Sequence, residues 1–216
     1  NFRNLEGMKI TAKVNQQGME IPLEIYQMAD GRQMTVIKFQ GQELKQGVFD
    51  GETLWGTNFQ TMKPEKSDAE STANFKLNTN DFPDSFLDYE SKGYTVELVG
   101  TETIEGTETY KIKLVREPLT IDGETREDVS FYYFDTENYV PIVMESEVHQ
   151  GPMKGQTQYI TFSDYQEVDG LYFPFSMSQG IKNGQSQPIS MDSIELNPEV
   201  DAAAFAFPEE MTEAKD

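Results

Sequence analysis

The side chains that most often carry catalysis or bind metals are scarce in this sequence. It has no cysteine, and His149 is its only histidine. Disulfides and thiolate chemistry are therefore excluded, and a Ser-His-Asp site would depend on that one residue. No HExxH, GxSxG, phosphate-loop or EF-hand pattern occurs. We interpret His149 as a surface or turn residue and predict no metal, no cofactor and no catalytic residue.

Paired carboxylates are the remaining chemistry that these residue types allow. Asp135 lies near Glu137, and Asp50 lies near Glu52. A glycoside hydrolase needs two such groups at a set separation in a cleft. With 38 Asp and Glu among 216 residues, close pairs arise by chance. A carboxylate-based hydrolase is therefore one hypothesis, but the prediction is that the protein is not an enzyme.

The charge balance excludes several kinds of partner. Seventeen Lys and Arg against 38 Asp and Glu give a formal net charge of −21. Nucleic-acid binding needs clustered cations, and so does electrostatic adhesion to an anionic membrane surface. The longest apolar runs are only a few residues, too short for a transmembrane helix. The chain opens on Asn1 without methionine, so we expect a processed or trimmed start.

Period-two alternation of apolar residues predicts β-strands along most of the chain. Runs at 8–14, 19–25, 34–39 and 42–49 alternate in this way, and Asp-Gly or Gln-Gly pairs punctuate them. Further strands are predicted at 53–59, 94–98, 110–114, 129–134, 140–148, 156–165, 171–181 and 189–196. About a dozen strands at hairpin spacing predict one continuous antiparallel sheet, strongly curved into an open, unclosed β-barrel.

A different composition marks residues 60–92. We expect a surface loop at 60–80 with a single helical turn, then a short helix that begins at Asp81 and stops before Gly93. Phe86 and Leu87 would form its buried stripe and cover the concave side of the sheet. Residues 1–216 are predicted to form a single domain with this loop and helix as an insertion.

The alternation also selects the side chains that we expect on the concave side. The only tryptophan, Trp55, follows the Asp50-Gly51 turn and is predicted to be a buried structural anchor. The residues alone allow a filled core or a cavity for an apolar ligand, and the ten methionines suit an adaptable surface. The predicted inward-facing residues are Ile10, Ala12, Val14, Ile21, Leu23, Ile25, Ile37, Phe39, Phe86, Leu87, Val96, Leu98, Ile112, Leu114, Phe131, Tyr133, Ile142 and Met144.

Four segments, in order, resemble outer-membrane lipoprotein carrier and sorting proteins of the LolA/LolB type. Residues 48–55 (VFDGETLW) resemble that family's DGxxLW strand-turn-strand, and residues 99–112 resemble its GxExIxGxxxYxI hairpin. Residues 164–174 (DYQEVDGLYFP) resemble a DYxxVDGxxxP element. Residues 194–208 resemble the closing strand and its FxFP tail.

The resemblance implies an open antiparallel β-barrel with helices over an apolar cavity. It implies a non-enzymatic carrier that holds the acyl chains of lipids or lipid-modified proteins. Its expected location is the periplasm or outer membrane of a Gram-negative bacterium, free or lipid-anchored. Carriers also tend to have an arginine on an early strand that closes the cavity, and the nearest candidate here, Arg32, is predicted in a turn. The alternative is an envelope protein-interaction or sensor module on the same fold, with a filled core.

Overall fold

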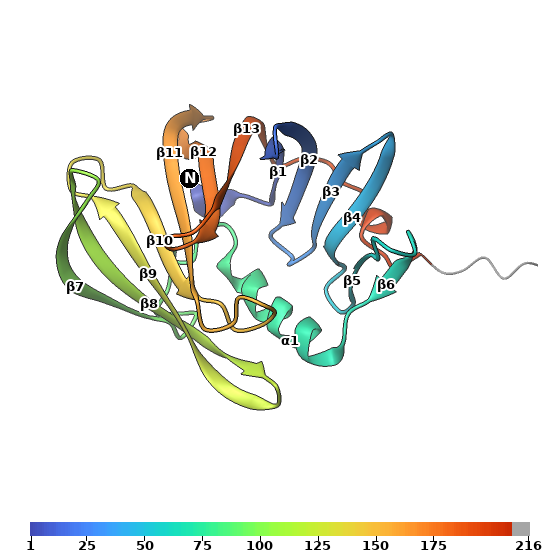
Figure 1. Cartoon of the computed structure of the whole chain (residues 1–216), viewed down its shortest axis with the longest axis horizontal. Coiled ribbons are helices and arrows are strands. Elements are labelled where there is room, and N and C mark those ends of the chain that lie inside the picture. The colour runs from blue at the N-terminus through green and yellow to red at the C-terminus, as the bar shows by residue number, and fades with distance from the viewer. Residues whose placement is uncertain (209–216) are drawn as a thin grey trace, which may run out of the picture.

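The protein folds as one strongly curved antiparallel sheet of thirteen strands with a short helix inside the curve (Figure 1). The computed structural model describes residues 1–208. The predicted fold class, a mainly β open barrel with helical cover, is confirmed. The elements are β1 (Gly7–Gln16), β2 (Met19–Met28), β3 (Gln33–Phe39), β4 (Gln42–Phe49), β5 (Leu54–Thr57), β6 (Pro64–Lys66), α1 (Ala69–Asn78), β7 (Thr95–Ile104), β8 (Thr107–Ile121), β9 (Glu124–Asp135), β10 (Pro141–Glu147), β11 (Thr157–Val168), β12 (Leu171–Ile181) and β13 (Ser186–Leu196), with single 3-10 turns at Phe2–Asn4, Thr79–Asp81 and Ala202–Ala204.

The strand order shows how the sheet is assembled. It runs β6-β5-β4-β3-β2-β1-β13-β12-β11-β10-β9-β8-β7, so every pairing except one joins neighbours in sequence. The exception is the seam between β1 and β13, where Met8 pairs with Leu196. Within residues 1–208 the outermost strands, β6 and β7, do not pair with each other, which leaves the barrel open.

Turn chemistry sets the hairpins. Asp122 and Gly123, between β8 and β9, both adopt positive φ, at 54° and 76°. These are the angles that a tight hairpin turn requires and that Asp-Gly tolerates well. Local conformational preference therefore accounts for this tight turn, while β8 and β9 extend further toward it than the predicted strands 110–114 and 129–134.

The helix lies elsewhere than predicted. We expected a loop at 60–80 and a helix from Asp81, but α1 spans Ala69–Asn78 and residues 82–94 form a series of turns. The carboxylate of Asp68 caps α1 by accepting from the Ser71 N–H at 2.7 Å. In the following segment Asp84 accepts from the Phe86 N–H at 2.8 Å, and Asp88 has φ 53°, which together favour turns over helix.

Trp55 packs on the outer face of the sheet, under the C-terminal segment 198–207. Its indole is 4% exposed, and its Nε1 donates to the carbonyl of Phe205 at 2.9 Å. The ring of Phe207 meets the indole edge-on, with the centroids 5.8 Å apart. Met28, Met34, Val36 and Val48 complete this cluster. Trp55 therefore fastens the end of the chain to β2–β5.

Candidate functional site

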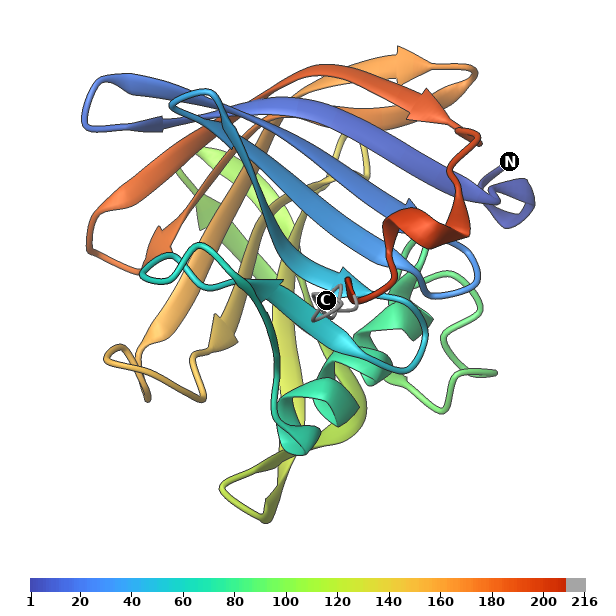
Figure 2. The same ribbon diagram turned by 90° about the vertical axis from the view of Figure 1, so that its right-hand side faces the viewer.

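Two faces of the curved sheet can be distinguished by what packs on them. We call the face toward α1 the inner face, because Phe75 of α1 meets Phe49 of β4 there, at a ring separation of 5.4 Å. Phe86 of the turn segment meets Tyr132 of β9 on the same side, at 4.9 Å. The outer face carries Trp55. Figure 2 shows the same arrangement from the side, with α1 inside the curve and the C-terminal segment outside it.

Apolar side chains form a continuous row across the inner face, which we call the apolar row. Neighbouring members of the row are cross-strand partners from β2 to β7, with one exception. Within β11 the row passes from Phe162 to Ile160, which are two positions apart and therefore on the same face. In sheet order the row is Ile21, Val14, Ile189, Met177 and Phe162, then Ile160, Met144, Tyr132, Ile112 and Leu98.

The apolar row is not sealed by the elements above it. Nine of its members are half-buried, and Leu98 is 61% exposed. Other inner-face positions are fully covered: Phe49 beneath α1 is 1% exposed, Phe173 beside Phe2 is 9% exposed, and neither Ala12 nor Leu114 is exposed at all. A filled barrel core would bury such residues completely. The apolar row therefore remains partly accessible apolar surface, although neighbouring inner-face positions are closed.

At the β7 end the row opens into a wholly apolar pocket of about 490 Å³. Phe86 forms one wall and meets the rings of Tyr132 and Phe134 edge-on. Tyr110 and Tyr139 stack in parallel at the opposite wall, 6.4 Å apart. No polar atom contributes to its surface. The pocket is lined by Phe86, Val96, Leu98, Tyr110, Ile112, Phe134 and Tyr139.

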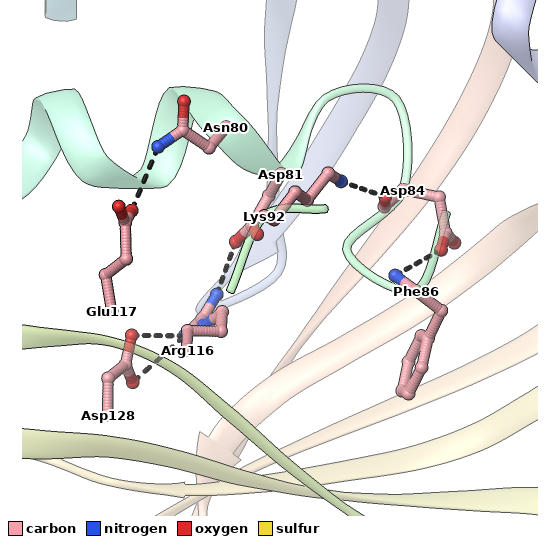
Figure 3. A network of polar contacts seen from close by, with 8 residues as sticks. All are labelled: Asn80, Asp81, Asp84, Phe86, Lys92, Arg116, Glu117 and Asp128. Atoms are coloured by element: carbon pink, nitrogen blue, oxygen red, sulfur yellow. Dashed lines mark hydrogen bonds and ion pairs between the residues drawn. The ribbon is translucent and has the colours of Figure 1, made fainter. Parts of the chain in front are cut away.

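The cover over this end, residues 79–94, is held to the sheet by one arginine (Figure 3). Arg116 of β8 donates to Asp81 of the cover at 2.5 Å and to Asp128 of β9 at 3.0 Å. Asn80 donates to Glu117 of β8 at 2.9 Å, beside the arginine. Arg116 thus lies between a carboxylate that belongs to the cover and one that belongs to the sheet.

The charge states around the cover follow from burial. Burial works against the charge of Arg116, but the carboxylates of Asp128 and Asp81 outweigh it and raise its pKa. Burial raises the pKa of Tyr132, and burial together with Asp81 raises that of Tyr94. The two phenols therefore stay neutral, and the charge of Arg116 is compensated by its two carboxylates.

Helix α1 bridges the two arms of the curved sheet. Phe75 packs on β4, at one arm. On the other side, Asn74 both donates to the carbonyl of Thr120 at 2.6 Å and accepts from its N–H at 3.0 Å. The carboxylate of Glu70 accepts from the N–H groups of Asp122 and Gly123 at 2.9 Å. The bridge is therefore apolar at one arm and polar at the other.

The register places most of the predicted inward-facing residues on the inner face. Leu87 is half-buried in the cover, but it does not line the apolar pocket. Ile142 lies at an irregular step in the pairing of β9 with β10 and lines a separate outer groove with Tyr159 and Ser178. The inner-face group, by pairing and alternation, comprises Ile10, Ala12, Val14, Ile21, Leu23, Ile25, Ile37, Phe39, Val96, Leu98, Ile112, Leu114 and Met144.

Two predicted residues lie on the opposite face. Phe131 and Tyr133 alternate with the inner-face Tyr132, and the Nζ of Lys111 lies 5.3 and 5.2 Å from their ring centroids. Their inward placement was therefore wrong, because β9 is aromatic on both faces and alternation alone cannot tell the faces apart.

Sequence reasoning also missed the arginine that holds the cover. Arg32, the nearest candidate on an early strand, lies over the Phe205 ring and pairs with Asp30. Arg116, on β8, holds the cover to the sheet. Its signal in the sequence was a charged residue two places after Leu114, where the alternation calls for an inward-facing side chain.

Comparison with known proteins gives a clear result for structures and none for sequences. No family model and no curated protein matches the sequence. A DUF1329 family protein from Desulfovibrio piger superposes with a TM-score of 0.60 and 14% identity, over 95% of this chain and 91% of that one. A LolA superfamily protein from Nitrosomonas europaea gives 0.56 and 12%, over 93% and 89%. The chain has a LolA-like fold.

A third solved structure with the LolA-like fold supports the same assignment. It is described as an outer-membrane lipoprotein-sorting protein domain from Vibrio parahaemolyticus, with a TM-score of 0.55 and 13% identity, over 92% of this chain and 88% of that one. Identities this low establish the fold and leave the function to the site. Within residues 1–208 no helix is long and apolar enough to span a membrane, and no cluster of three His, Asp or Glu is arranged to hold a metal.

Proposed function

We propose that this protein is a non-enzymatic carrier that holds acyl chains, of lipids or of lipid-modified proteins, against its inner face. The observation that carries the proposal is the apolar row, which is half-buried on eight strands and ends on the ninth, β7, in a wholly apolar pocket. Each methylene group that leaves water for such a surface contributes about 0.8 kcal/mol. An acyl chain that lies along the row would be stabilised by this free energy once for each methylene group it buries, without any directional contact.

The chemistry of the pocket favours acyl chains over polar head groups. Its lining has no polar surface. The nearest guanidinium, Arg116, is already engaged by Asp81 and Asp128. Arg116 is therefore not free to pair with a phosphate group, so the recognised part of the ligand is the hydrocarbon. Non-directional contacts of this kind also allow release, which a carrier requires.

The cellular setting is inferred from the fold. Solved proteins with a LolA-like fold include one described as a lipoprotein-sorting domain of the outer membrane. By that analogy we place this chain in the periplasm, or lipid-anchored at the outer membrane, of a Gram-negative bacterium. Its partners would be lipid acyl chains or lipid-modified proteins, together with an envelope protein that supplies or receives them.

Binding of an environment-sensitive fatty-acyl probe tests the proposal. The variant of choice is Leu98→Asp, because Leu98 lines the pocket yet is 61% exposed, so that its replacement does not empty the core. Val99→Asp is the matched control, since Val99 is 50% exposed on the same strand but does not line the pocket. We expect saturable binding by the wild type, about tenfold weaker binding by Leu98→Asp, and no change in Val99→Asp.

Equal behaviour of the two variants would contradict a role for the pocket. A folded wild type that shows no saturable binding would contradict the carrier proposal itself. The interaction module would then be the better reading, with the accessible inner face serving a protein partner.

A further inference from the structure

The two ends of the open barrel differ sharply in charge. Antiparallel pairing sends successive turns to alternate ends of the barrel, and five turns that are consecutive in sheet order share one end. They gather along the left-hand side of Figure 2. We call them the acid-free rim, and they comprise residues 58–63, 39–42, 15–19, 182–187 and 149–156.

None of the residues in the acid-free rim is Asp or Glu, although the chain has 38 of them. The rim consists mainly of Gln, Asn and Gly, with cations at Lys63, Lys154 and Lys182. The turns at the opposite end each contain an acid, in the segments 29–32, 50–53, 104–107, 135–139, 166–170 and 197–201.

One further turn belongs by topology to the same end as the rim but lies apart from it. The β8–β9 turn carries Asp122 and Glu124, and Figure 2 shows it at the foot of the molecule. Asp122 accepts from Lys154 of the rim at 2.9 Å. Glu124 pairs with Arg126. Asp122 and Glu124 are thus compensated locally, whereas Glu20 and Glu43, which directly follow two of the rim turns, are exposed acids.

Large apolar side chains project from three of the rim's loops. Phe59 is 59% exposed and Met62 45%, both in the β5–β6 loop, while Met19 is 52% and Met153 48% exposed. Single exposed apolar residues are ordinary. Here four stand on three protruding loops along one edge, so that a surface that approaches this edge could meet them together.

We propose that the acid-free rim is the surface on which this protein docks to a phospholipid bilayer, with Phe59, Met62, Met19 and Met153 entering the head-group region. The charge pattern favours a bilayer over a basic protein partner, because the rim offers no carboxylates for such a partner to bind. The acidic end lies about 30 Å away, the length of a ten-residue strand, which is several times the Debye length of about 8 Å. Of the two ends, this one therefore meets the weaker repulsion from an anionic membrane, since its turns carry no acid and its nearest exposed acids, Glu20 and Glu43, lie just behind them.

The rim is also continuous with the inner face. The Val14–Ile21 pair of the apolar row lies directly behind the β1–β2 turn, and Ile189 follows the β12–β13 turn by two residues. Docking at the rim would bring this end of the row to the bilayer surface. The inference goes beyond acyl-chain binding and does not depend on it, since the rim residues and the apolar pocket are separate.

Co-flotation with vesicles tests the docking surface. Two compositions are used, phosphatidylcholine alone and phosphatidylcholine with one-third phosphatidylglycerol. The double variant Phe59→Ser, Met62→Ser should lose about tenfold in affinity for both. Tyr172→Ser is the matched control, because Tyr172 is as exposed as Phe59 but lies beside the β11–β12 turn at the acidic end. Its binding should be unchanged.

Raising the salt concentration should strengthen binding to the anionic vesicles, because it screens the repulsion between them and the negatively charged protein. A basic peripheral protein would show the opposite salt dependence.

A second set of variants tests the charge argument without removing apolar surface. Gln42→Glu, Gln150→Glu and Gln185→Glu place acids on exposed rim positions. Each should weaken binding to the phosphatidylglycerol vesicles by up to about fivefold and affect phosphatidylcholine vesicles less. Absence of vesicle binding by the wild type, or an equal loss in Tyr172→Ser, would overturn the proposal. Vesicle binding without acyl-probe binding would support the docking role of the rim and contradict the carrier proposal. The failures of the two proposals are therefore distinguishable.

Discussion

Removal of the Asp81 carboxylate should release the cover without unfolding the sheet. In Asp81→Asn the bond from Arg116 loses its charged acceptor, while the pair of Arg116 with Asp128 remains. A hydrogen bond to a charged group contributes roughly 1.5–3 kcal/mol. The side chains of both partners are only 21% exposed, so water replaces the lost contact incompletely, and about 2 kcal/mol is a reasonable expectation. That free energy corresponds to roughly thirty times more of the detached cover at equilibrium.

Hydrogen exchange measured by mass spectrometry on the segment 82–94 reports this detachment directly. We expect about thirtyfold faster exchange there in Asp81→Asn, with exchange in β1 and β13 unchanged. Asp88→Asn is the control, since Asp88 pairs with Arg3 from the same cover, but both side chains are more than half exposed. An exposed pair of this kind contributes little. Equal acceleration in both variants, or acceleration across the whole sheet, would refute the role of Arg116 as the tie between cover and sheet.

Three further outcomes are expected. Trp55→Ala should lower the free energy of unfolding by about 3–5 kcal/mol in urea denaturation, because the indole is almost fully buried. Hydrogen bonds from Ser71 lower the pKa of Asp68, so its support of α1 is present above the ordinary value of 3.8 and lost as the pH falls through the lowered pKa. Exchange of the α1 amides should then be faster in Asp68→Ala at pH 7 and should match the wild type at strongly acidic pH. His149→Ala should leave the urea midpoint unchanged, and a large drop would show an unrecognised structural role.

The sheet was largely predictable because its signals are local. Asp-Gly turns and period-two alternation act within a few residues, and both are strong in β1–β4 and β8–β13. The helix was misplaced for a related reason. α1 buries no residue completely, so it lacks an apolar stripe, and its main sequence signal is the cap at Asp68. Phe86 and Leu87 were expected on a helix, but the turns around Asp84 and Asp88 carry them instead.

The site was predictable only where one face of a strand is plainly apolar. β2 shows such a contrast, with Ile21, Leu23 and Ile25 on the inner face. β9 has aromatic residues on both faces, so its pattern does not show which face is turned inward, and Tyr133 was assigned to the wrong face. Arg116 had a local signal, a charge at an inward-facing position, but its partners Asp81 and Asp128 could not be identified from the sequence, because only the folded chain brings the three together.

The seam between β1 and β13 has a consequence for the order in which the molecule can form. β1–β6 and β7–β13 are each meanders of local hairpins, which close quickly because their loops are short. The seam joins strands from opposite ends of the chain and cannot form until β13 has been synthesised. Until then β1 has an unpaired edge, a template for wrong pairing between chains. The N-terminal half of this protein should therefore depend on protection by a chaperone during synthesis or export, up to the moment when β13 arrives.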